Sequence, residues 1–187
     1  EYLIAVGHLL SDASIFNEVG IIYVIDRKSP FDIIKKIEVP YCPTDVAIHN
    51  KLIYISYGAK LNVYQFVDND LKLISSVDTK TVTYTMKVVD DCIFVFDLCR
   101  SLSIYKINGT SLDLLASDNR HILITTGAFL SNRKLLLCES TGKLIIARIN
   151  EKMKSIEAIS TFMFDQVFND FTYVNSRELE SIIKDAA

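Results

Sequence analysis

The sequence predicts an all-β fold, namely a partial β-propeller of about four WD40-like blades followed by a short C-terminal helix. Three observations support this prediction. One short pattern of strand, turn, strand, loop and strand occurs four times. Its copies begin about 40 residues apart, close to the roughly 40–45 residues of a four-stranded blade. The β-rich runs also carry bulky side chains on both faces, as expected of sheets packed between other sheets.

The clearest element of the repeat is a β-rich run that follows a Gly, Lys or Arg turn. Its four copies are residues 20–26, 60–66, 100–107 and 142–149. A second strand precedes each copy across a short turn, at residues 2–6, 52–56, 93–96 and 135–138. A third strand follows each copy, at residues 33–39, 71–77, 112–116 and 156–164. These three runs define one repeat unit.

A fourth strand completes the later units, at residues 44–48, 82–89 and 122–129. Turn residues separate the runs, for example at residues 68–70 and 108–109. The three prolines are expected in loops, where a missing N–H costs nothing; they are Pro30, Pro40 and Pro43.

The C-terminal residues have a different pattern. Ser176 is suited to cap a helix, and Leu179, Ile182 and Ile183 give that helix one apolar face. We therefore expect residues 1–174 to form the partial propeller and residues 175–187 a helical segment. Closed propellers usually need more than four blades. Since the chain has no initiator Met, we expect an upstream segment of the same full-length chain to supply the remaining blades, with another chain as the alternative.

Composition excludes several classes of protein. The net charge of −3 lacks the basic excess of autonomous nucleic-acid binders, so any association with RNA or DNA is expected to be indirect or local. No apolar stretch approaches the ~20 residues that span a bilayer. The cysteines form no CxxC pair and are expected to be small buried hydrophobes in a reducing compartment; they are Cys42, Cys92, Cys99 and Cys138. We predict neither a metal site nor a cofactor.

No catalytic residue is predicted, and the protein is expected not to be an enzyme. His49 and His121 are interpreted as turn or loop residues, because no nucleophile motif accompanies them. Asp90 and Asp91 precede a strand, where Asp favours a turn. A propeller hydrolase remains a remote alternative. It would place acids or His on the innermost strands, which we expect to be apolar.

Several local motifs resemble the C-terminal region of the cleavage and polyadenylation specificity factor large subunit (A subunit) family. That family also includes the large subunit of the damaged-DNA-binding protein and subunit 3 of splicing factor 3b. Residues 1–8 are similar to a family strand that ends in Val-Gly-Thr, with Gly7 at the glycine. Gly20 begins a run similar to the family's Gly-Arg-Ile.

The third motif, residues 93–104, is similar to a hydrophobic run followed by Gly-Asp, two or three residues, a basic residue and Ser. Its matching positions are Asp97, Arg100 and Ser101. Independently of the family, the oxygens of Asp97 and Ser101 are expected to accept backbone N–H groups of the turn. Asp118 matches the family's Ala-Arg-Asp, and Gly142 matches its Asp-x-x-Gly-Asn-Leu turn. These positions form a structural motif.

The resemblance implies the last propeller of a three-propeller scaffold, closed partly by distant N-terminal strands and followed by a small helical domain. It implies a nuclear, non-enzymatic scaffold for protein partners in mRNA 3′-end processing or splicing. The alternative is an adaptor of a cullin-type ubiquitin ligase that acts in DNA damage recognition. Residues 97–101 favour the damaged-DNA-binding branch, whereas residues 4–7 favour the cleavage-factor branch, so the branch stays open.

Overall fold

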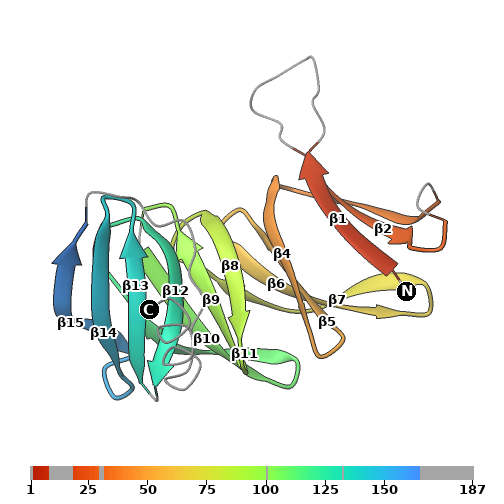
Figure 1. Ribbon diagram of the computed structural model, residues 1–187. Helices are drawn as coiled ribbons and strands as arrows, with labels where there is room; N and C mark the ends of the chain where they lie inside the picture. Colours follow the sequence, from red (N-terminus) through yellow and green to blue (C-terminus); the bar gives the residue numbers. More distant parts are fainter. Residues whose placement is uncertain (1, 9–18, 30–31, 100, 132, 165–187) are drawn as a thin grey trace, which may run out of the picture.

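A computed structural model describes residues 2–8, 19–29, 32–99, 101–131 and 133–164. Within these ranges the chain is entirely β, with fifteen strands in three hydrogen-bonded sheets (Figure 1). The predicted helix of residues 175–187 lies outside the described residues, as does the boundary at residue 174. No helix in the described ranges is long and apolar enough to cross a membrane.

The strands group into four blades that follow one another along the chain. Blade 1 holds β1 (Tyr2–His8), β2 (Gly20–Asp26) and β3 (Ile33–Val39). Blade 2 holds β4 (Pro43–His49), β5 (Leu52–Tyr57), β6 (Lys60–Val67) and β7 (Asp70–Asp78). Blade 3 holds β8 (Thr83–Val89), β9 (Cys92–Asp97), β10 (Ser101–Asn108) and β11 (Ser111–Ser117). Blade 4 holds β12 (Ile124–Ser131), β13 (Lys134–Glu139), β14 (Lys143–Asn150) and β15 (Ser155–Met163).

Strand order within each blade is sequential and antiparallel, as in a meander. Blades 3 and 4 form one eight-stranded sheet only because Ser117 of β11 pairs in parallel with Ser155 of β15. The strands β2, β6, β10 and β14 coincide with the four copies of the clearest repeat element. The predicted partial propeller is therefore confirmed.

Tight turns between the strands explain why the repeat is so regular. Asn50 and Lys51 join β4 to β5 with φ of 48° and 66°, and Asp68 and Asn69 join β6 to β7 with φ of 54° and 59°. Two successive residues with positive φ give a turn whose twist matches that of the flanking strands. The predicted turn roles of these Asp and Asn residues are confirmed. Pro43, by contrast, is the first residue of β4 and does not lie in the loop before it.

The hydrophobic core lies between blades because the middle strands are apolar on both faces. On β9, Ile93 and Val95 pack toward blade 2, whereas Phe94 and Phe96 pack toward blade 4. All four side chains are at most 1% exposed. Burial of each such side chain contributes about 1.5–3 kcal/mol, so each blade depends on its neighbours for stability.

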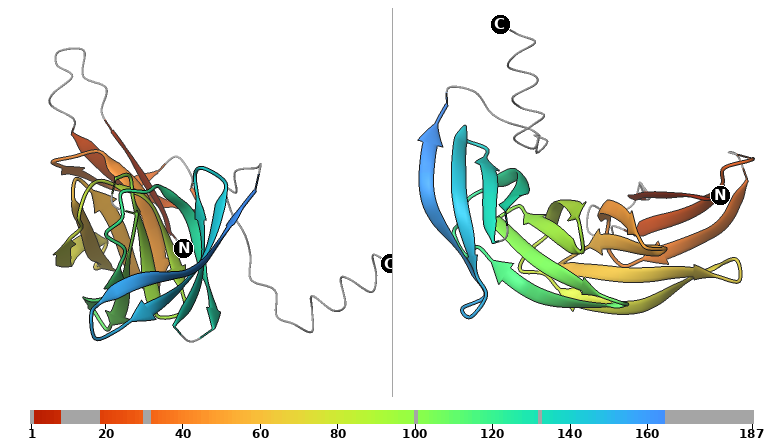
Figure 2. Two further views of the ribbon diagram at one scale, coloured as in Figure 1. Left: turned by 90° about the vertical axis from the view of Figure 1, so that its left-hand side faces the viewer. Right: turned by 60° about the horizontal axis from the view of Figure 1, so that its bottom comes forward.

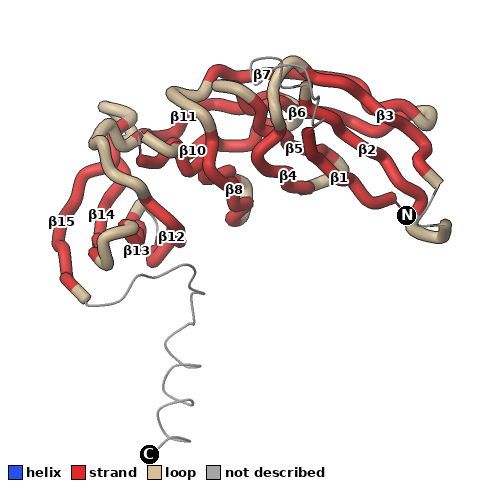
Figure 3. Tube along the Cα trace, turned by 90° about the horizontal axis from the view of Figure 1, so that it is seen from above, coloured by secondary structure: helices blue, strands red, loops and turns tan. Residues whose placement is uncertain are grey.

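The four blades lie side by side along an open arc, with blades 1 and 4 at its two ends (Figure 2). Seen from above, β3, β7, β11 and β15 follow the outer, convex side (Figure 3). The first strands of blades 2, 3 and 4 lie on the concave side, and β4 contacts β8 there. The concave side corresponds to the inside of a propeller ring.

Candidate functional site

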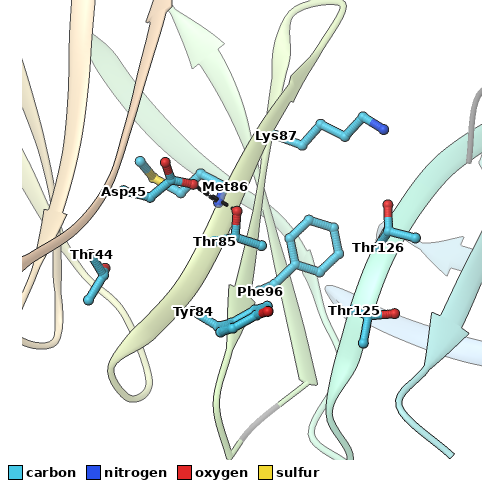
Figure 4. A pocket seen from close by; sticks show the side chains of 9 residues that line it. All are labelled: Thr44, Asp45, Tyr84, Thr85, Met86, Lys87, Phe96, Thr125 and Thr126. Atoms are coloured by element: carbon cyan, nitrogen blue, oxygen red, sulfur yellow. Dashed lines mark hydrogen bonds between the residues drawn. The ribbon is translucent and has the colours of Figure 1, made fainter. Parts of the chain in front are cut away.

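The concave side carries a pocket of about 580 Å³ between β4, β8 and β12 (Figure 4). This volume falls within the ~300–1,000 Å³ typical of ligand sites. The lining side chains are mainly polar or aromatic: Thr44, Asp45, Tyr84, Thr85, Met86, Lys87, Phe96, Thr125 and Thr126. The innermost strands are therefore not apolar along this stretch, and that expectation was wrong.

A repeat in the sequence produces the polar lining. Asp45, Thr85 and Thr126 occupy equivalent positions on their inner strands, because each pairs with the penultimate residue of the next strand, namely Ser56, Phe96 and Cys138. Because successive blades place their inner strands side by side, the three residues come together on the concave side. In the sequence, the signal is a polar residue that recurs about every 40 positions, at Asp45, Thr85 and Thr126.

Asp45 is the pocket's carboxylate and connects two blades. Its Oδ2 atom accepts hydrogen bonds from Thr85 Oγ1 at 2.8 Å and from the Met86 backbone N–H at 2.7 Å. Its Oδ1 atom accepts a 2.8 Å hydrogen bond from the Val46 backbone N–H. The carboxylate of Asp45 in blade 2 thus accepts one backbone and one side-chain hydrogen bond from β8 in blade 3.

The pocket pairs no second acid or His with Asp45 among the residues that line it. More widely, the described residues contain no group of three or more His, Cys, Asp or Glu side chains that could hold a metal ion. The lining can donate and accept hydrogen bonds and stack on flat groups. These are properties of a binding surface.

A second polar cluster lies at the loop between β11 and β12. The Ser101 hydroxyl donates a 2.9 Å hydrogen bond to Asp118 Oδ2. The Arg120 guanidinium donates to both Asp118 oxygens, with Nε 2.9 Å from each. These hydrogen bonds raise the pKa of Arg120. Asp118 is 1% exposed, so its hydrogen bond with Ser101 joins β10 to the loop after β11 in the interior of blade 3.

Lys80 extends this cluster toward blade 2. Its ammonium donates to the backbone carbonyl of Asp118 at 3.2 Å and to the side-chain oxygen of Asn119. Lys80 belongs to the loop between β7 and β8, whereas Asp118 and Asn119 belong to the following loop. The two loops are thus connected by side-chain hydrogen bonds.

The structure shows no hydrogen bond to the Asp97 carboxylate from Leu98 or Cys99, the described residues of the predicted turn, whereas Arg100 lies outside the described residues. The Asp97 side chain is 0% exposed, and neither carboxylate oxygen has a hydrogen-bond partner of good geometry. Burial raises the pKa of Asp97 to about 7, although the charge of Lys80 and the backbone of Thr81 oppose the shift. Ser101 also differs from expectation, since its hydroxyl is a donor to Asp118.

The equivalent position in blade 4 is Glu139, the last residue of β13, as Asp97 is the last of β9. Glu139 accepts hydrogen bonds from Thr141 Oγ1 at 2.9 Å and from Lys143 Nζ at 3.5 Å. One repeat position therefore carries a carboxylate without a hydrogen-bond partner of good geometry in blade 3 and a hydrogen-bonded carboxylate in blade 4.

The motif glycines have different structural roles. A Cβ at Gly20 would lie 2.0 Å from the Tyr41 carbonyl oxygen and 2.4 Å from Pro43 Cδ, so only glycine fits. Gly142 has a φ of 85° in the turn before β14, which favours glycine. A Cβ at Gly7 would meet no described residue within 4 Å, so packing among the described residues does not explain that glycine. Arg100 lies outside the described residues.

The remaining candidates are the histidines, the Asp90 turn and the cysteines. His49 ends β4 and hydrogen-bonds to the Asn50 side chain at 2.9 Å, and His121 is exposed in a loop. Asp90 has a φ of 52° in the turn before β9, which confirms a turn role. None of the four cysteines forms a disulfide in the described part of the chain. Cys138 is buried as expected, Cys42 and Cys92 are half-buried, and Cys99 is exposed, contrary to expectation.

A model of the protein family described as the CPSF A subunit region matches residues 2–181. The chain belongs to the CPSF A subunit region family. The match covers nearly the whole chain and confirms the family that the local motifs indicated. A comparison with curated proteins found no match.

Membership in the CPSF A subunit region family relates the blades to a subunit of a larger assembly. The family takes its description from a subunit, that is, from a component of a larger assembly. In this member, Asp118, Ser101 and Gly20 serve packing and hydrogen bonding inside the propeller. Apart from Phe96, the pocket residues on the concave side lie outside the local motifs that resemble the family.

Proposed function

We propose that this chain is a non-enzymatic scaffold for protein–protein interaction in a nuclear mRNA-processing complex, acting in 3′-end cleavage and polyadenylation or in splicing. The observation that carries the proposal is the family match over residues 2–181. The described blades support it, because their polar motif residues contribute to blade packing and their loops and outer strands remain at the surface. Partners are other protein subunits, and any RNA contact is indirect.

Exposed apolar side chains on the outer strands and loops suit such a role. Leu73 on β7 is 53% exposed, Tyr41 in the loop before β4 is 58% exposed, and Ile159 on β15 is 51% exposed. Interfaces are enriched in aromatic and large apolar residues at their buried centres. These positions supply contact area that subunits of an assembly can cover.

The alternative function is an adaptor of a cullin-type ubiquitin ligase in DNA damage recognition. The turn of residues 97–101 favours this branch, since its sequence resembles that of the damaged-DNA-binding relatives. In this role the same blades would also act by binding proteins, so the two functions differ in their partners and share their physical basis.

Affinity purification of the tagged full-length protein from nuclear extract, followed by mass spectrometry, tests the proposal. We expect subunits of the polyadenylation or splicing machinery to be recovered at near-stoichiometric levels. Recovery of a cullin in their place would favour the adaptor function. Recovery of neither set of partners would refute both.

A further inference from the structure

The half of the inner pocket that lies between β4 and β8 is rich in hydrogen-bond acceptors. The Thr85 hydroxyl uses its proton on Asp45, so its lone pairs are what remains for a ligand. The Thr44 hydroxyl is already paired with Ser56 Oγ at 2.8 Å. A carboxylate offers about four acceptor sites, and Asp45 uses three of them. This half therefore suits a ligand that donates hydrogen bonds.

A half-exposed aromatic side chain lines the same pocket. Tyr84 lines the pocket next to Thr85 on β8 and is 50% exposed (Figure 4). A half-exposed tyrosine offers a ring face on which a cation can stack. Lys87 also lines the pocket, but its side chain points toward β12 and away from Asp45 (Figure 4). Its charge therefore leaves the β4 side as the place for a positive ligand.

We propose that this pocket binds an arginine side chain of a protein partner, with its guanidinium directed at Asp45 and Thr85 and stacked on Tyr84. Arginine fits better than lysine because its planar fork carries five N–H donors and stacks on aromatic faces. Arginine is also enriched among the residues that dominate binding energy at protein interfaces. This inference rests on the proposed role as a protein scaffold and specifies one point of contact.

Titration of the isotope-labelled full chain with the peptide acetyl-Gly-Arg-Gly-amide, followed by NMR, tests the proposal. We expect saturable shifts of the Thr85 and Met86 amides, because the Met86 N–H bonds to the carboxylate that would receive the guanidinium. The citrulline peptide has the same shape without the charge. We expect it to bind at least about tenfold more weakly than the arginine peptide. A glutamate peptide is expected to leave these amides unchanged.

Two variants separate the pocket from general effects. Tyr84→Ala is expected to weaken arginine-peptide binding about fivefold or more, since the ring face is lost. Phe162→Ala, at a similarly exposed aromatic of β15, is expected to leave binding unchanged. Both sites are surface positions, and thermal melting of each variant checks that it is folded.

Equal binding of the arginine and citrulline peptides, or shifts caused by the glutamate peptide, would overturn the proposal. An absence of saturable shifts at Thr85 and Met86 would also overturn it. None of these outcomes affects the recovery of complex subunits in the purification, so failure of the arginine site and failure of the scaffold function are distinguishable.

Discussion

The carboxylate of Asp45 on β4 accepts a 2.7 Å hydrogen bond from the backbone N–H of Met86 on β8. The two residues belong to different blades, whose middle strands pack against each other through apolar side chains. This contact lets one blade satisfy a backbone donor on the innermost strand of the next. The concave side of the propeller is thus held by polar interactions, and the space between blades by hydrophobic ones.

Replacement of Asp45 by Ala is expected to destabilise the protein by about 1–3 kcal/mol, because the Met86 N–H and the Thr85 hydroxyl lose their acceptor. Urea unfolding monitored by circular dichroism measures the change. Glu38→Ala serves as control, since Glu38 is an exposed acid whose ion-pair partner among the described residues is Lys36. The control should change stability by no more than about 0.5 kcal/mol. Equal effects of the two substitutions would contradict the structural role of Asp45.

Asp118 and Arg120 are expected to be coupled. Asp118→Asn should cost about 1–3 kcal/mol, because the buried acceptor of Ser101 and Arg120 loses its charge. Arg120→Met alone should also destabilise the protein, and the double variant should lose less than the sum of the two. A double-mutant cycle in urea gives the coupling energy. Additive effects would show that the pair does not act as a unit.

Asp97 is expected to make stability depend on pH. Its folded pKa of about 7 lies above the ordinary aspartate pKa of 3.8, so the folded state prefers the protonated acid. Stability from this group is therefore greatest at low pH, falls as pH rises from about 4 to 7, and is level above that range. The full loss is on the order of 3–4 kcal/mol.

The variant Asp97→Asn isolates this effect, since an amide cannot ionise. We expect the variant to be more stable than the parent at pH 8 and to lose that advantage by pH 4.5. Urea unfolding at a series of pH values provides the comparison. A stability difference that does not change across this range would mean that the carboxylate is not held in its neutral form.

Two glycines provide a matched test of packing. Gly20→Ala is expected to cost about 1–3 kcal/mol or more, because its Cβ would lie 2.0 Å from a backbone oxygen that cannot move freely. Gly7→Ala adds the same methyl group where no described residue lies within 4 Å, and it should be neutral or slightly stabilising. Thermal unfolding of both variants decides the matter. Similar melting temperatures for the two would contradict the packing at Gly20.

The strands and turns of the blades could be predicted because they recur in the sequence as a repeat. Strands such as Lys60–Val67 carry apolar residues on both faces, and turns such as Asp68-Asn69 require residues that tolerate positive φ. Both signals depend on neighbours in the chain, and they occur at a fixed spacing. The apolar pattern of the strands and the turn residues were therefore enough to locate the blades in the sequence.

The site could not be predicted in the same way. Asp45 and Met86 are 41 residues apart, and only the placement of successive inner strands brings them into contact. Asp97 was expected to accept turn amides, yet its carboxylate is buried and has no hydrogen-bond partner of good geometry among the described residues. Such relationships depend on how blades pack against each other, and residue type alone does not encode them.

Cross-linking mass spectrometry of the complex purified with the full-length protein tests the central claim, that this propeller is a protein-binding scaffold. Lysines on the outer strands and loops, including Lys35, Lys72 and Lys80, are accessible reporters on different blades. We predict cross-links from these lysines to other subunits of an mRNA-processing complex. Cross-links confined to the chain itself, in a preparation where the other subunits cross-link among themselves, would contradict the scaffold function.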